Sequence, residues 1–99
     1  MDQIIKHIDQ NMQDIYRKAV DADEKLTALK KQGMAKFTSI FEQQNLFKCQ
    51  QNQFMPYVVE LADDICTFKE NPQDRELLVL ITKKLEQLHK ILLAFKQVV

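Results

Sequence analysis

The stretch IIKHIDQNMQDIYRKAVDADEKLTALKKQG, residues 4–33, decides the fold of this chain. Its apolar residues recur in alternating steps of three and four positions: Ile5, Ile8, Met12, Ile15, Ala19, Ala22, Leu26 and Leu29. This spacing forms one stripe along a helix and is kept for about four heptads. Because Gly33 suits a helix end, the pattern predicts a helix over 3–32, about 45 Å long.

The middle of this helix carries a small pair, Ala19 and Ala22, against which another helix can pack closely. That partner is either another segment of the chain or a second copy, and the spacing fits both. The charged residues around the stripe are expected to form a solvated face: Asp21, Asp23, Glu24 and Lys25.

Three further helices are predicted downstream, over 34–55, 56–69 and 72–97. In the first of these, polar, Gln-rich stretches interrupt the aromatic residues, so a break near Asn45 is an alternative. Pro56 suits a first helical turn, and Asn71-Pro72 has the form of an N-cap followed by proline. The fold class is therefore all-α, an antiparallel bundle of about four helices in one domain, residues 1–99.

The bulk composition agrees with this class and narrows the functions. The chain has 45% hydrophobic residues, one glycine and two prolines, and its 14 basic side chains equal its 14 acidic ones. A neutral chain has no general attraction for nucleic acid. It has no apolar run of about 18 residues, so no membrane partner is expected and the predicted location is the cytoplasm. Cys49 and Cys66 are expected to be buried, inert thiols.

No catalytic or metal-binding motif stands out. The imidazoles, His7 and His89, lie beside the apolar stripes and are expected at the surface. Glu60, Asp63 and Asp64 cluster on neighbouring helical turns, yet a calcium loop needs a glycine-containing turn. We therefore expect no enzyme, no cofactor and no metal site.

A weak basic patch is the candidate site for DNA or a protein partner. Its residues are Lys30, Lys31, Lys36 and Lys48, which flank the first predicted turn and the helix after it. The alternative is that these are ordinary solvated lysines beside a turn.

The second half of the chain carries a resemblance to a known family. Leu46-Phe47 followed by Glu60, Asp63, Asp64, Ile65 and Phe68 reads LF…ExxDDIxxF, preceded by Phe41-Glu42 and followed by the apolar spacing of LVLITKKLEQLHKIL. This pattern, over roughly 37–92, resembles the family of PriC, the primosomal replication protein N″. Gln43 stands where the family's Phe-acidic-Arg motif has its arginine.

The resemblance implies a function in restarting stalled replication forks, without catalysis. PriC-like proteins help load the replicative helicase at forks coated by the single-stranded DNA-binding protein, so both proteins are implied partners, with fork or single-stranded DNA. Members of the family are longer and basic, and the arginines that contact the single-stranded DNA-binding protein lie in their C-terminal half. This neutral chain would then be the N-terminal domain of a longer protein.

A different class of function fits the long first stripe equally directly. Four heptads can pair with a second copy, which is typical of a self-associating helical adaptor or a small chaperone. The oligomeric state in solution distinguishes the two functions, and a monomer is expected for the replication-restart function.

Overall fold

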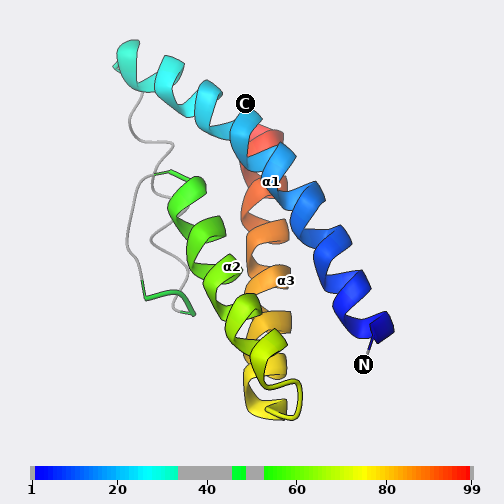
Figure 1. The fold of residues 1–99 in the computed structure, drawn as a ribbon. Coiled ribbons are helices and arrows are strands. Elements are labelled where there is room, and N and C mark those ends of the chain that lie inside the picture. Colours follow the sequence, from blue (N-terminus) through cyan, green and yellow to red (C-terminus); the bar gives the residue numbers. More distant parts are fainter. Residues whose placement is uncertain (1, 34–45, 49–52, 99) are drawn as a thin grey trace.

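The computed structural model describes residues 2–33, 46–48 and 53–98 of the chain. Within them it contains three α-helices: α1 (Asp2–Lys31), α2 (Met55–Glu70) and α3 (Arg75–Val98). Figure 1 shows them packed as one bundle in which α1 extends beyond the start of α2. The predicted all-α class is confirmed, whereas four helices are not supported.

Contacts between the helices define their directions. Asp9 of α1 pairs with Lys69 near the end of α2, while Asp23 of α1 contacts the start of α2. Phe54, directly before α2, meets Phe95 near the end of α3. Thus α2 runs antiparallel to both neighbours and α1 lies parallel to α3, an up-down-up arrangement that Figure 1 displays.

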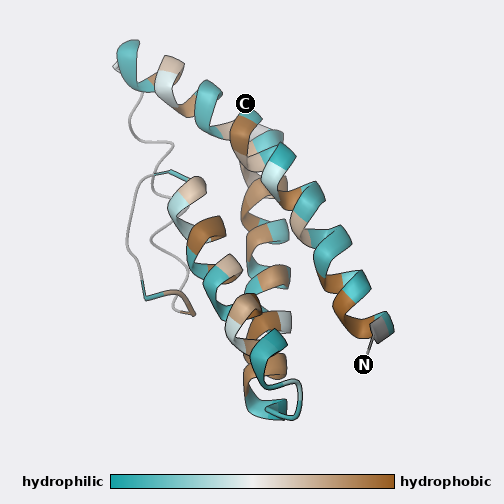
Figure 2. Cartoon of the chain, viewed as in Figure 1, coloured by the Kyte–Doolittle hydropathy of each residue, from teal (hydrophilic) through white to brown (hydrophobic). Residues whose placement is uncertain are grey.

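The apolar stripe of the first helix is confirmed as its core-facing side. Ile8, Ile15, Ala19, Ala22 and Leu26 are buried in the bundle, and the other stripe residues are partly buried against it. In Figure 2 the apolar residues recur as bands along a largely hydrophilic α1, while α3 is more continuously hydrophobic. The small pair of α1 therefore packs within the chain, against α2 and α3.

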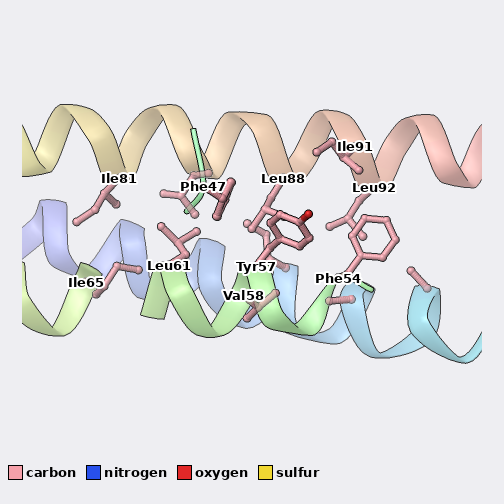
Figure 3. Packing of buried hydrophobic residues seen from close by; sticks show 14 of the residues in the cluster. Phe47, Phe54, Tyr57, Val58, Leu61, Ile65, Ile81, Leu88, Ile91 and Leu92 are labelled. Carbon is pink, nitrogen blue, oxygen red and sulfur yellow. The ribbon is translucent and has the colours of Figure 1, made fainter. Parts of the chain in front are cut away.

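Aromatic side chains from four places in the sequence fill the centre of the bundle. Phe54, Phe68 and Phe95 are almost fully buried, and the rings of Phe54 and Phe95 meet at 5.6 Å between centroids. Phe47 and Tyr57 meet edge to face at 5.2 Å. Figure 3 shows Phe47, Phe54 and Tyr57 between α2 and α3, among aliphatic residues such as Leu61 and Leu88. Ring pairs of this kind stabilise the fold by more than the burial of their apolar area alone.

The predicted helix over 34–55 is wrong at residues 46–48 and 53–54, and Met55 begins α2 instead. Leu46–Lys48 and residues 53–54 are not helical, and residues 34–45 and 49–52 lie outside the described residues. Phe47 is instead held by tertiary contacts, because its ring packs on Tyr57 and beneath the Lys84 ammonium. Local propensity yielded to the burial of one aromatic ring.

The start of α2 is capped by a side chain from another helix. Its N-cap residue, Phe54, has no side-chain acceptor, yet the Asp23 carboxylate of α1 accepts the amides of Phe54 at 2.6 Å and Met55 at 3.0 Å. Pro56 has no amide hydrogen to satisfy. The expected solvated face of α1 is thus wrong at Asp23, which is half-buried, and correct for Asp21, Glu24 and Lys25, which are exposed.

The turn between α2 and α3 also differs from the prediction. Asn71 ends α2 rather than starting α3, since its amide donates to the carbonyls of Thr67 and Phe68. Asp74 takes the capping position, and its carboxylate accepts the Leu77 amide at 3.1 Å. Cys66, expected to be buried, is exposed on α2, and Cys49 lies outside the described residues.

We predict that Asp23→Ala destabilises the fold by about 1–2 kcal/mol. The change removes two hydrogen bonds to a charged acceptor and the favourable carboxylate at a helix N-terminus. Urea unfolding followed by circular dichroism measures the difference. The matched control is Glu24→Ala, the exposed neighbour, which should change stability by less than about 0.5 kcal/mol. Equal midpoints for the two variants would contradict the cross-helix cap.

Candidate functional site

A buried lysine between α2 and α3 is bonded to two carboxylates of the neighbouring helix. Lys84 of α3 is 2% exposed. Its Nζ donates to Glu60 Oε2 at 2.9 Å and to Asp64 Oδ2 at 2.5 Å. Glu60 and Asp64 lie one turn apart on α2, so one helix face presents both carboxylates to the lysine.

The same cluster holds the segment before α2. The Lys84 Nζ lies 5.2 Å from the centroid of the Phe47 ring, within the range of a cation–π contact. The next residue, Lys48, donates its backbone amide to Glu60 Oε2 at 2.9 Å. We call Phe47, Glu60, Asp64 and Lys84 the Lys84 cluster. The Lys84 ammonium thereby contacts residues from segment 46–48 and from α2, and it belongs itself to α3.

The electrostatic balance of the Lys84 cluster keeps the lysine protonated. Burial by itself lowers the pKa of Lys84, but the hydrogen bonds and charges of Asp64 and Glu60 outweigh it. The pKa is raised above the ordinary value of 10.5. A lysine acts as a nucleophile only after losing its proton, so this environment suits an ion pair rather than covalent chemistry.

The three acidic residues of α2 that the sequence placed together, Glu60, Asp63 and Asp64, do not all point the same way. Glu60 and Asp64 turn to Lys84, whereas Asp63 is exposed. Within residues 2–33, 46–48 and 53–98, no group of three His, Cys, Asp or Glu side chains could hold a metal ion.

The three candidate lysines that the structure describes lie at different levels along the bundle. Lys30 and Lys31 form the last turn of α1, about 12 Å beyond the level of Asp23 and the start of α2. Lys48 lies beside Glu60, about 8 Å along α2 in the opposite direction. Figure 1 shows this separation between the end of α1 and segment 46–48. Lys36 lies outside the described residues.

A groove between α1 and α3 was not foreseen from the sequence. It has a volume of about 330 Å³. We call it the α1/α3 groove, and its walls are formed by Lys18, Asp21, Ala22, Lys25, His89, Leu92, Leu93, Phe95 and Lys96. His89 is half-buried at one end, with Nε2 3.2 Å from Asn11 Oδ1, and His7 is exposed.

The sequence contained a weak signal for the Lys84 cluster. Lys84 lies directly before Leu85 and one turn after Ile81, at the margin of the apolar stripe of α3. A carboxylate pair spaced by one turn on the preceding helix could have suggested a buried partner. The α1/α3 groove had no such signal, since its walls come from distant residues whose register only packing sets.

No helix in the described part of the chain is both long and apolar enough to cross a membrane. Comparisons with protein-family models, with curated proteins and with solved structures find no match to this chain.

We predict that Lys84→Met lowers the free energy of unfolding by about 3 kcal/mol. Breaking a buried ion pair from one side is costly, and the partial exposure of Glu60 (17%) and Asp64 (24%) places the cost at the lower end of the known range. Urea unfolding measures it. The control Lys83→Met, at the exposed neighbour, should stay within about 0.5 kcal/mol of the wild type.

Neutralising the carboxylates as well should restore much of this loss. In the triple variant Lys84→Met, Glu60→Gln, Asp64→Asn no unpaired charge remains, so at least about half of the stability should return. If the triple variant were no more stable than Lys84→Met alone, the unpaired carboxylates would not be the source of the loss, and the explanation by a broken ion pair would be contradicted.

A pH series tests the direction of the Lys84 pKa. Because the folded-state pKa lies above 10.5, protonated Lys84 favours folding, and its contribution is complete below that value and lost as pH rises through the folded-state pKa. The stability difference between wild type and Lys84→Met should therefore stay constant from about pH 8 to pH 10 and shrink above about pH 10.5. A decline that begins below about pH 10 would contradict the raised pKa.

Proposed function

We propose that this chain is a non-enzymatic accessory domain of DNA replication restart, which helps load the replicative helicase at stalled forks through protein and fork-DNA contacts. In this function the domain acts as a scaffold. Its partners are the helicase and the single-stranded DNA-binding protein, and its cellular location is the cytoplasm.

The spatial arrangement of the residues behind the PriC resemblance is the observation that supports the proposal. Phe47, Glu60 and Asp64 meet at Lys84, although the Leu-Phe pair and the acidic residues are well separated in sequence. Ile65 and Phe68 are buried in the same hydrophobic core as Phe47, whereas Asp63 is exposed. Most residues of the pattern thus share one part of the fold, as expected if the pattern encodes a fold that the family shares.

The DNA contact is assigned to the lysines at the end of α1 and beside α2. Lys31 and Lys48 are exposed, and about 20 Å separates their levels along the bundle. A nucleic-acid backbone repeats its charge every few ångströms, so one strand can reach both positions. Because the whole chain is neutral, we expect weak binding that depends strongly on salt.

The adaptor alternative has lost the feature that supported it. Its support was that the α1 stripe could pair with a second copy, and Ile15, Ala19 and Leu26 of that stripe are buried within the chain itself. We therefore favour the replication-restart proposal.

The proposal predicts that Lys31→Glu combined with Lys48→Glu weakens binding to a forked DNA by at least about tenfold at about 50 mM salt. Fluorescence anisotropy of a labelled fork with a single-stranded gap measures it. The slope of log affinity against log salt should fall by about two, one for each lost phosphate contact.

The matched control reverses two exposed lysines of α3, Lys83→Glu and Lys90→Glu, with the same change in net charge. It should weaken binding by less than about threefold if the contact is local. Equal losses in the two variants would show attraction by net charge alone, and no binding by the wild type at low salt would remove DNA from the proposal.

A further inference from the structure

The α1/α3 groove combines an apolar floor with a basic rim. Ala22 of α1 and Leu92 of α3 are 6% exposed and form part of the floor. Leu93 stands at the edge and is 57% exposed. A concave apolar floor with a few polar groups around it is the usual form of a ligand-binding site.

The charge around this groove is positive, although the chain as a whole is neutral. Lys18, Lys25 and Lys96 line it against one acidic residue, Asp21. Lys18 is partly neutralised by Asp14 at 3.0 Å, an exposed pair on the same helix. Lys25 and Lys96 are exposed and come from different helices, so they approach any ligand from both walls.

From these features we propose that the α1/α3 groove binds a short acidic peptide segment of a partner protein, one that carries an apolar anchor side chain. Carboxylates of the segment would meet Lys25 and Lys96, while the anchor would lie on Leu92 beside Leu93. This inference is independent of the proposed function, because its residues differ from the lysines assigned to DNA.

The dimensions of the groove set the length of the segment. Its walls span Lys18–Lys25 on α1 and His89–Lys96 on α3, each about 10 Å long. The volume of about 330 Å³ lies at the small end of the range for ligand pockets, about 300–1,000 Å³. That space suits one or two apolar side chains with flanking carboxylates, presented from about two turns of an amphipathic helix.

The apolar floor favours a peptide over a nucleic-acid strand. Single-stranded nucleic acids bind basic grooves in which exposed aromatic rings stack on the bases. The aromatic ring of this groove, Phe95, is 2% exposed and packs against Phe54 inside the core. It offers no face for stacking, and the remaining floor is aliphatic.

The test uses a defined probe, a labelled synthetic peptide of about 12 residues with leucines at helical i, i+3, i+4, i+7 spacing and glutamates elsewhere. Fluorescence anisotropy should show saturable binding, and amide shift changes in NMR spectra should concentrate in residues 18–25 and 89–96. A peptide with lysine in place of every glutamate should bind at least about tenfold more weakly.

Two variants and a control locate the contact. Lys25→Glu with Lys96→Glu should weaken binding at least about tenfold, and Leu93→Asn about fivefold, whereas Lys83→Glu with Lys90→Glu should change it less than about twofold. All four lysines and Leu93 are exposed, so the variants should fold, which circular dichroism checks.

Four results would overturn the proposal: absence of saturation, equal binding of the basic peptide, shift changes centred outside the groove, and equally strong competition by an oligothymidine of about 12 nucleotides. Shifts of the groove residues on dilution without peptide would assign the groove to a second copy and overturn it too. The fork-binding measurement with Lys31 and Lys48 variants remains separate, so each proposal fails independently.

Discussion

A lysine ammonium removed from water has to be surrounded by acceptors, and this requirement at Lys84 fixes how the helices of the chain meet. The cost of burying an unpaired charge is large compared with the net stability of a small domain. Only a register that brings both Glu60 and Asp64 to Nζ satisfies the lysine. The same register places the Phe47 ring next to the charge. An apolar contact tolerates sliding of α3 along α2, whereas these directional bonds do not.

The contact between α1 and α2 also depends on a polar group that needs a partner, but here the charged side chain is an acceptor and the groups in need are donors. Here the group that needs a partner is the start of α2, where backbone amides lack helical acceptors. Asp23 supplies that acceptor from the middle of α1. Apolar stripes thus provide most of the burial, while Asp23 at the start of α2 and Lys84 against Glu60 and Asp64 add directional contacts that fix α1 and α3 relative to it. Both contacts are partly buried between the helices, and the groups considered for partners lie on the outer surfaces.

Those outer surfaces divide into two regions with different chemistry. The end of α1 and segment 46–48 present cations spread along the bundle, which suits a repeating polyanion. The α1/α3 groove presents cations around an aliphatic floor, which suits a peptide that is both acidic and apolar. The Lys84 cluster stabilises this arrangement without taking part in either region.

The sequence by itself determined the helical class and the core-facing side of each helix, because the three-and-four spacing of apolar residues has one physical solution. It could not determine the number of helices or the non-helical conformation of Leu46–Lys48, where the ring of Phe47 is buried by tertiary contacts. It also assigned Asp23 to a solvated face, since a charged residue at the margin of a stripe is usually hydrated, and it gave only a weak signal for Lys84 in the core. Only the tertiary structure placed their partners, Phe54 and Met55 amides for one and two carboxylates for the other, within hydrogen-bonding distance. The α1/α3 groove likewise exists only after packing, because it combines positions about 70 residues apart whose alignment depends on those two buried charges.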